Sequence, residues 1–302
     1  MIRVVQNPKE ANCITHSGTM HADEVFATAF LDLYFQNITV YRTNQVPENL
    51  DSDVLVYDIG RGKFDHHQLD AEKRENGIPY SSFGLLWREF GKDYLTREGF
   101  SNIEKLFLGI DSDLVEGIDG DDNGVFPKIE APYKVKAIPQ IIRIFNPSFD
   151  SNENENDQFM KAVELAKSIL KEEFIYMNGK VMADEKVGNI LDHRDLQQKY
   201  LILEEYIPYE DALLRHENTD NILFVAFPSN RGGYAIKTVP ISIEDKNPRM
   251  AFPEEWAGLV DQELETVSQI EGLGFCHTGR FIVNCKTKEA MYQVLDKLCQ
   301  EA

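Results

Sequence analysis

Histidines and aspartates near the start of the chain have the residue types that bind divalent metal ions. Four of the seven histidines in 302 residues fall within the first 67 positions. Two of them, His66 and His67, directly follow Asp65, which itself comes seven residues after Asp58. Imidazole nitrogens and carboxylate oxygens at such spacing are typical of metal centres. The sequence therefore predicts a metal site in this part of the chain.

The candidate set is too large for a single ion. Mixed imidazole and carboxylate ligands suit Mn²⁺, Fe²⁺, Co²⁺ or Zn²⁺, whereas oxygen ligands alone favour Mg²⁺ or Ca²⁺. Two ions ~3.5–4 Å apart, sharing a carboxylate and a water, would use the whole set. Taken alone, each residue also has an ordinary structural role, since Asp23 could cap a helix and Asp58 could stand in a turn. The candidates are His16, His21, Asp23, Asp58, Asp65, His66 and His67, with one further carboxylate from the acidic segment 111–122.

Short apolar segments in front of these residues are predicted to form a parallel sheet. The strands cover 12–15, 38–43 and 54–57, and the apolar spacing after Asp23 predicts a helix over 24–36. Ligands bind such sheets beyond the carboxyl ends of the strands. His16 and Asp58 both follow a predicted strand, so we expect them at the same edge.

The rest of the chain predicts helices and then a second group of strands. Helices are expected over 158–176, 187–200 and 288–299, with strands at 221–228, 233–241 and 274–285. We therefore predict an α/β fold with two domains and an active site in the cleft between them. Residues 1–185 would form a parallel-sheet catalytic domain, and residues 186–302 a smaller α+β substrate-binding domain.

Composition limits the classes of substrate and the cellular location. There are 31 basic and 51 acidic residues, which give a net charge of −20. A field of this sign repels long polyanions and favours a short substrate held by local cations. No apolar run has the ~20 residues of a membrane span, and no signal peptide is recognisable. Four cysteines without paired spacing indicate the reducing cytoplasm.

Several blocks of the sequence resemble a known family. Asp58 followed by D-H-H at 65–67 is similar to the DHH phosphoesterase superfamily. Longer blocks resemble its Myg-type exonuclease family and span residues 15 to 282. These blocks are T-H-S-G-T-M-H-A-D-E (15–24), Y-D-I-G-R-G-K-F-D-H-H-Q (57–68), Y-S-S-F-G-L-L-W (80–87), I-D-G-D-D-N-G (118–124), P-E-E-W-A-G-L (253–259) and F-C-H-T-G-R-F-I (275–282).

The resemblance implies roles for the metal-site residues. His16, His21 and Asp58 would hold one ion, and Asp23, Asp58, His66 and Asp119 the other, with Asp58 as the bridge. Asp122 remains an alternative to Asp119. His67 would contact the phosphoryl group or a metal, and Asp65 would orient a ligand histidine. The cofactors would be two divalent cations, Mn²⁺ first, with Mg²⁺, Co²⁺ or Zn²⁺ as alternatives. The chain has His21-Ala22-Asp23 where much of the superfamily has Asp-x-Asp, which favours softer transition metals.

The predicted C-terminal domain carries groups that could hold a phosphate. A planar guanidinium grips phosphate with two hydrogen bonds, and glycine-rich turns let backbone N–H groups approach an anion. We expect Arg280 to act in catalysis and in substrate binding. His277, Gly279 and Arg231 are the other predicted substrate-binding residues.

These observations predict a metal-dependent phosphodiester hydrolase. The resemblance implies 3′–5′ exonuclease activity on RNA or short oligonucleotides, in which a water bridging two metal ions attacks phosphorus in line. One alternative is a small-molecule phosphohydrolase, such as a pyrophosphatase or a cyclic-dinucleotide phosphodiesterase. Another is a metal- or nucleotide-binding protein without activity. Protein partners and oligomeric state stay open.

Overall fold

The computed structural model describes residues 2–301, which form two compact units. Unit 1 is Met1–Gly179 and unit 2 is Lys180–Ala302. The division falls within one long helix, α6 (Glu155–Asp192), and the predicted domain boundary at 185/186 lies in the same helix and stays a prediction. No helix among residues 2–301 has both the length and the apolar character needed to cross a membrane.

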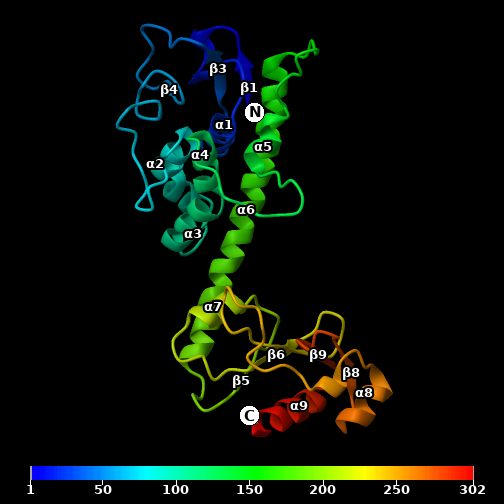
Figure 1. The fold of residues 1–302 in the computed structure, drawn as a ribbon. Coiled ribbons are helices and arrows are strands. Elements are labelled where there is room, and N and C mark those ends of the chain that lie inside the picture. Colours follow the sequence, from blue (N-terminus) through cyan, green and yellow to red (C-terminus); the bar gives the residue numbers. More distant parts are fainter. Residues whose placement is uncertain (1, 302) are drawn as a thin grey trace. The chain divides into compact units, whose positions relative to one another are not determined.

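Unit 1 contains the parallel sheet that the sequence predicts (Figure 1). All three strand pairings are parallel, and Cys13 of the second strand pairs with Val40 on one side and Leu55 on the other. The carboxyl ends of these neighbouring strands therefore lie at one edge. The strand order is β1-β3-β2-β4, with β1 (Arg3–Val5), β2 (Cys13–His16), β3 (Thr39–Thr43) and β4 (Leu55–Val56).

A central helix, α1 (Ala22–Phe35), connects β2 to β3 and is buried over residues 22–32. Most of its side chains are apolar and pack in the core of unit 1. Its first turn is buried too, so the carboxylates of Asp23 and Glu24 are held inside the unit. The other helical segments are α2 (Ser82–Arg97), α3 (Ile103–Ile110), the π-helical turn η2 (Asp111–Val115), α4 (Glu116–Asp122), α5 (Ile138–Arg143) and the 3₁₀ turn η1 (Pro8–Glu10).

Helix α6 corrects part of the sequence prediction. The expected helices 158–176 and 187–200 are one continuous helix over Glu155–Asp192, and residues 200–202 form a strand. The intervening segment contains Gly179 but no proline. A single glycine costs a helix only about 1 kcal/mol, which packing of the flanking turns can outweigh. The first turns of α6 pack in the core of unit 1, and Val187 and Leu191 pack in a core of unit 2.

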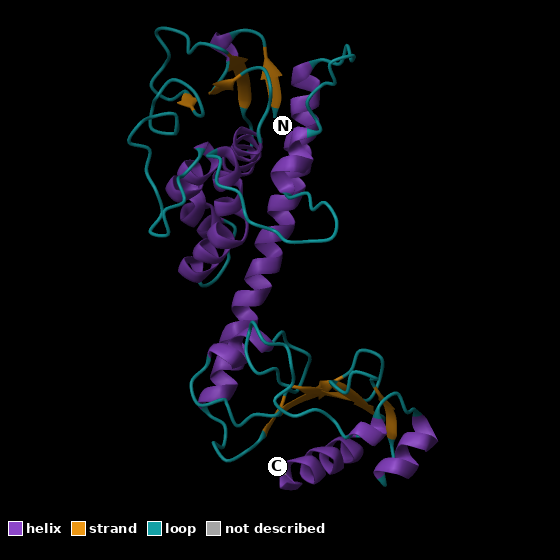
Figure 2. Ribbon diagram, in the orientation of Figure 1, coloured by secondary structure: helices purple, strands orange, loops and turns teal. Residues whose placement is uncertain are grey.

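Unit 2 is a mixed sheet with helices, as the α+β prediction requires (Figure 2). Its strand order is β5-β6-β7-β9-β8, and only the β5–β6 pair is parallel. Helix α9 packs along β7 and β9. The strands are β5 (Tyr200–Ile202), β6 (Phe224–Pro228), β7 (Tyr234–Thr238), β8 (Leu273–Cys276) and β9 (Ile282–Cys285), and the helices are α7 (Glu210–Arg215), η3 (Glu254–Trp256), α8 (Asp261–Ser268) and α9 (Lys288–Glu301).

Candidate metal centre

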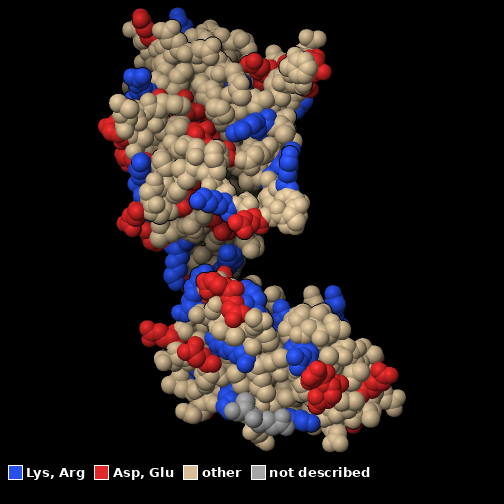
Figure 3. Space-filling view, in the orientation of Figure 1, with Lys and Arg blue, Asp and Glu red and all other residues tan. Residues whose placement is uncertain are grey.

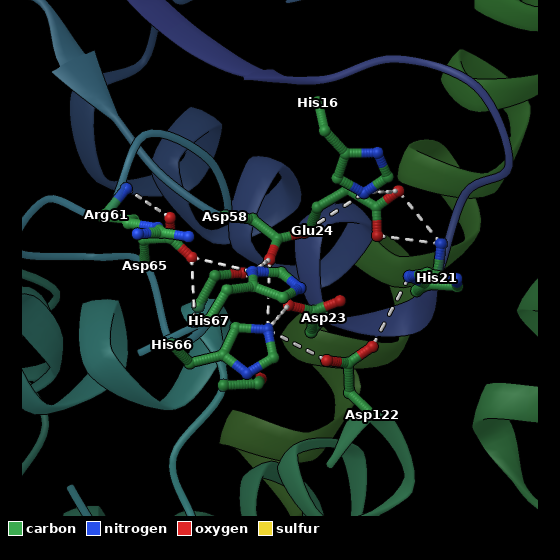
Figure 4. A network of polar contacts seen from close by, with 12 residues as sticks. His16, His21, Asp23, Glu24, Asp58, Arg61, Asp65, His66, His67 and Asp122 are labelled. Carbon is green, nitrogen blue, oxygen red and sulfur yellow. Dashed lines mark hydrogen bonds and ion pairs between the residues drawn. The ribbon is translucent and has the colours of Figure 1, made fainter. Parts of the chain in front are cut away.

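Side chains that the sequence nominated as metal ligands come together at the carboxyl edge of the unit 1 sheet (Figure 4). His16 ends β2, and Asp58 lies two residues beyond β4. His21 is the N-cap residue of α1, and Asp23 lies in the first turn of that helix. His66 belongs to the loop that follows Asp58. The parallel sheet and the buried start of α1 thus bring together residues from distant parts of the sequence.

Asp58 lies between two histidines and offers a different oxygen to each. Its Oδ2 is 3.1 Å from His16 Nε2, and its Oδ1 is 3.2 Å from His66 Nε2. The side chain is only 2% exposed. The backbone φ is +56°, in the left-handed region that aspartate adopts more readily than most residues. A carboxylate with one oxygen toward each of two ligand groups has the arrangement that a bridging ligand needs.

Glu24 belongs to the cluster and was not among the residues nominated from the sequence. Its Oε1 is 3.2 Å from His16 Nε2, and both of its oxygens accept the backbone N–H of His21, at 3.0 and 2.9 Å. The available signal was its position three residues after the N-cap, from which a glutamate side chain reaches back to the cap. Because helix capping alone explains a glutamate at this position, the sequence contains no separate indication of the contact between Glu24 and His16.

The acidic segment contributes Asp122 to the cluster in place of Asp119. Asp122 Oδ2 is 3.0 Å from His66 Nε2, and Asp122 Oδ1 is 3.6 Å from His21 Nδ1. Asp122 is the last residue of α4, so its side chain projects from the end of that helix toward the histidines. We therefore replace Asp119 by Asp122 in the proposed ligand set.

Asp119 has other partners that account for its complete burial. Its Oδ1 accepts hydrogen bonds from Ser81 Oγ at 2.5 Å and from the backbone N–H of Gly84 at 3.0 Å. Its Oδ2 is 2.8 Å from Arg74 Nη2, and the same guanidinium forms two hydrogen bonds to Asp111. Burial raises the pKa of Asp119 to about 6, against the opposing effect of Arg74. Asp119 thus anchors α4 to α2 and holds the helix that carries Asp122.

Replacing Gly84 by alanine should destabilise the protein by about 1–3 kcal/mol. A Cβ at this position would lie 1.9 Å from Asp119 Oδ2, and that carboxylate cannot move away without losing Arg74 or Ser81. Urea denaturation would measure the free energy of unfolding. Gly188→Ala is the matched control, because Gly188 is also helical and has no atom within 4 Å of its Cβ position. If Gly84→Ala is as stable as the wild type, the close packing around Asp119 is not rigid.

His67 and Asp65 form a pair at the rim of the cluster. His67 Nδ1 is 2.8 Å from Asp65 Oδ1, and the His67 side chain is 60% exposed. Asp65 also accepts the backbone N–H groups of His67 at 3.1 Å and of Arg61 at 2.5 Å. Burial alone would raise the pKa of Asp65, but these hydrogen bonds outweigh it and lower the pKa. The histidine that Asp65 contacts, and would orient, is therefore His67.

The cluster concentrates negative charge around its histidines. Burial alone would lower the pKa of His16 and of His66, but close contacts with two carboxylates each outweigh it and raise both pKa values to about 11. Burial would likewise raise the pKa of Asp58, but its two histidine partners lower it to about 2. Burial and the nearby charge of Asp58 raise the pKa of Asp23. A metal ion would replace protons on the histidines, because only a neutral imidazole binds metal.

Buried atoms without hydrogen bonds support a metal in this cluster. Three of the ten buried side-chain atoms without a well-oriented hydrogen bond in the described residues belong to this cluster: Asp23 Oδ1, Asp58 Oδ1 and His66 Nε2, although the last two lie 3.2 Å apart. Such atoms are costly to leave unpaired, and all three belong to the same cluster. Their imidazole and carboxylate chemistry suits a divalent transition metal. Donor atoms within 4.8 Å of one another occur in four sets: His16–His21–Glu24, Asp58–His66–His67, His21–Asp23–Asp122 and Asp23–Glu24–Asp58.

Asn123→Ala should weaken Mn²⁺ binding about 10–100-fold. Asn123 Nδ2 donates to the carbonyl of Asp119 at 2.8 Å, so its Oδ1 faces His66 Nδ1 at 3.3 Å. This acceptor keeps the proton on Nδ1 and leaves Nε2 for a metal. Calorimetric titration with Mn²⁺ would measure the change, with the exposed Asn76→Ala as control. An affinity within twofold of the wild type would show that Asn123 does not orient His66.

The phosphate-binding residues predicted in the second half of the chain lie in two turns of unit 2. His277, Gly279 and Arg280 lie between β8 and β9, where His277 Nδ1 accepts the Gly279 N–H at 2.9 Å. Arg280 has a φ of +54° and donates to the Phe252 carbonyl at 3.4 Å. Arg231 lies in the turn between β6 and β7. Their contact with a substrate stays a prediction.

Comparison with known proteins identifies relatives along nearly the whole chain. A family model named MYG1_exonuc, described as an uncharacterised protein family (UPF0160), matches residues 12–298. The MYG1 protein YER156C of Saccharomyces cerevisiae is 31% identical over 330 residues, which cover 97% of each chain. The MYG1 protein of Dictyostelium discoideum is 29% identical and covers 91% of this chain and 92% of its own. A human protein named MYG1 exonuclease is 26% identical over 91% of this chain and 82% of its own.

Solved structures give a weaker comparison. The crystal structure of RecJ in complex with Mg²⁺ from Thermus thermophilus aligns with 97% of this chain at 14% identity and a TM-score of 0.25. The chain spans about half the length of that RecJ chain, since 50% of it is covered. A score this low carries no argument for a common fold, and the relation to the DHH superfamily stays a prediction.

Proposed function

The chain belongs to the MYG1_exonuc family, and on that basis we propose that it is a metal-dependent phosphoesterase that removes nucleotides from the end of a nucleic acid. The human relative bears the name exonuclease, which motivates the reaction class. The observation that carries the proposal is the position of Asp58. Its carboxylate is buried between His16 and His66, next to other potential metal-ligating atoms that lack a well-oriented hydrogen bond.

Two groups of side chains would hold two divalent cations, with Asp58 in both. When bound, such ions acidify a water molecule that attacks phosphorus and offset the charge on the phosphoryl oxygens. We favour Mn²⁺, because histidine and carboxylate ligands are mixed in both groups, with Mg²⁺, Co²⁺ and Zn²⁺ as alternatives. The first group is His16, His21, Glu24 and Asp58, and the second is Asp23, Asp58, His66 and Asp122.

His67 would bind the substrate through its exposed edge. Asp65 Oδ1 accepts a hydrogen bond from Nδ1–H, so the ring presents Nε2 to solvent on the side away from Asp65. Nε2 would contact the phosphoryl group of the substrate, and the hydrogen bond to Asp65 holds the ring in the orientation that this contact needs. Asp65 acts through His67 and is therefore a positioning residue.

RNA or a short oligonucleotide is the proposed substrate, cleaved from its 3′ end. The net charge of −20 is unfavourable for holding a long polyanion along the surface. On the face shown in Figure 3, Lys and Arg side chains are interspersed with Asp and Glu and form no continuous track. We therefore expect the protein to bind only the end of the nucleic acid, through contacts close to the metal centre. Location in the cytoplasm stays a prediction from the cysteine pattern.

End-labelled RNA tests the proposed function. With Mn²⁺, a 3′ label should be released at once as a mononucleotide, whereas a 5′ label should remain on progressively shorter products. Chelation of the metal should stop both the release of the 3′ label and the shortening of the 5′-labelled RNA. Hydrolysis of pyrophosphate alone would instead indicate a small-molecule phosphohydrolase. If RNA, DNA, pyrophosphate and cyclic dinucleotides all stay intact with Mn²⁺, Mg²⁺, Co²⁺ and Zn²⁺, the chain is not the enzyme proposed here.

A further inference from the structure

A cavity of about 380 Å³ opens beside the metal centre and has one cationic side chain other than histidine in its lining. Its lining includes Asn44 and Arg61 together with residues of the cluster and its rim, namely His16, His21, Asp58, Asp65 and His67. Its volume is at the lower end of the range for small-ligand sites, about 300–1000 Å³. Arg61 is therefore the one Lys or Arg among residues 2–301 that lines the cavity in which the substrate of the proposed reaction would react.

The guanidinium of Arg61 has no partner among the described residues of the chain. The interactions of Arg61 involve its backbone N–H and carbonyl, and no ion pair includes its side chain. Nearby cations differ, since Lys63 is paired with Glu89 at 2.6 Å and Arg74 is paired with two aspartates. An arginine without a carboxylate partner of its own is available to an external anion.

Two hydrogen bonds hold the backbone of Arg61, and a third closes the loop beside it. Its N–H donates to Asp65 Oδ2 at 2.5 Å, and its carbonyl accepts from Gln68 Nε2 at 3.0 Å. Asp65 N–H in turn donates to the carbonyl of Gly62 at 3.2 Å. The φ of Arg61 is +57°, a conformation that costs a non-glycine residue about 1–2 kcal/mol. The loop thus fixes the point from which the side chain extends, beside the pair Asp65 and His67 (Figure 4).

Asn44 supplies a second donor on the same cavity. Its Oδ1 accepts a hydrogen bond from Ser17 Oγ at 2.7 Å, which sets the orientation of the amide. The Nδ2 group has no hydrogen-bond partner in residues 2–301, and Asn44 is one of the residues that line the cavity. The guanidinium of Arg61 and the amide N–H₂ of Asn44 can donate hydrogen bonds but cannot accept them. This chemistry matches the acceptor oxygens of a phosphate.

We propose that Arg61 and Asn44 form a phosphate-binding subsite in unit 1, which holds a phosphate monoester or the terminal phosphodiester of the substrate next to the metal centre. The inference rests on the proposed function for the identity of the substrate, but phosphate binding can be measured without turnover. The net charge of −20 repels an anionic substrate, and the positive charge of Arg61 in this subsite would offset that repulsion locally. Because it binds the unreacted phosphate as well, its loss should raise KM more than it lowers kcat.

Calorimetric binding of adenosine 5′-monophosphate to the Mn²⁺-loaded full chain tests the subsite. Arg61→Asn should bind at least about tenfold more weakly than the wild type, since a charged hydrogen bond of this kind is worth about that factor. Asparagine tolerates the left-handed backbone, so the variant should fold. Arg61→Lys should recover part of the affinity, because it restores the charge without the planar fork. Lys63→Asn is the matched control and should bind like the wild type.

The outcomes separate the subsite from the proposed function. Unchanged nucleotide binding in Arg61→Asn, with a wild type that hydrolyses RNA, overturns the subsite and leaves the function standing. A wild type that binds the nucleotide through Arg61 but hydrolyses no phosphodiester supports the subsite and contradicts the function. A wild-type chain that binds no nucleotide contradicts the subsite. Equal losses in Arg61→Asn and Lys63→Asn would indicate a general charge effect and would also contradict it.

Discussion

Asp58→Asn should lower kcat/KM for Mn²⁺-dependent hydrolysis by at least about 10³-fold, which corresponds to about 4 kcal/mol of transition-state stabilisation. Among the residues that the structure describes, Asp58 is the one carboxylate in contact with both His16 and His66, so its loss affects both proposed ion positions. Asparagine keeps the size of the side chain and tolerates the φ of +56°. The variant should therefore fold, and circular dichroism would verify that it does.

Asp53→Asn is the control for this loss. Asp53 is an exposed aspartate of the same loop-and-strand segment, five residues before Asp58. Its replacement removes the same charge from the chain without touching the cluster, and activity should be unchanged. If Asp58→Asn retains activity within tenfold of the wild type, Asp58 is not a metal bridge and the centre is assigned incorrectly.

Asp122→Asn should weaken metal binding but leave stability nearly unchanged, whereas Asp119→Asn should lower stability but leave metal binding nearly unchanged. Asp122 contacts His66 at 3.0 Å and has 11% exposure, so its replacement should weaken Mn²⁺ binding about 100-fold with little change in the free energy of unfolding. Asp119 is completely buried against Arg74, and removing its charge should cost about 3–5 kcal/mol of stability. Calorimetry with Mn²⁺ and urea denaturation measure the two quantities on each variant.

This pair of variants decides between the two aspartates. A folded Asp119→Asn protein should still bind Mn²⁺ within about tenfold of the wild type, because Asp119 makes no contact with the histidines. Should Asp119→Asn lose the metal while Asp122→Asn keeps it, the sequence-based choice of Asp119 would be correct. The proposed ligand set would then need Asp119 restored.

The sequence predicted correctly that two candidate ligands that follow neighbouring strands lie close together. His16 ends β2 and Asp58 lies two residues beyond β4, and the rule that such ends share an edge needs no knowledge of side-chain packing. The α/β class followed from the order of predicted strands and helices, and the α+β character of the second unit followed from a change to short strands in that part of the sequence. These features depend on local patterns, which a single sequence displays.

The exact ligand set could not be read from the sequence, because it depends on partners far along the chain. Asp119 and Asp122 are three residues apart, and such residues share a helix face. What separates them is Arg74, which comes 45 positions before Asp119 and engages that carboxylate. Glu24 had a sufficient local explanation as a helix-start residue. Continuous α6 was missed because core packing at both of its ends outweighs the cost of Gly179.

The most direct test of the metal centre is an anomalous difference map from crystals grown with Mn²⁺. Data collected at the manganese absorption edge locate the ions without any assumption about activity. The arrangement of donors predicts two peaks with Asp58 between them, one near His16 and Glu24 and the other near His66 and Asp122. A map without a peak at this cluster, from crystals that hold manganese elsewhere or none, would contradict the account.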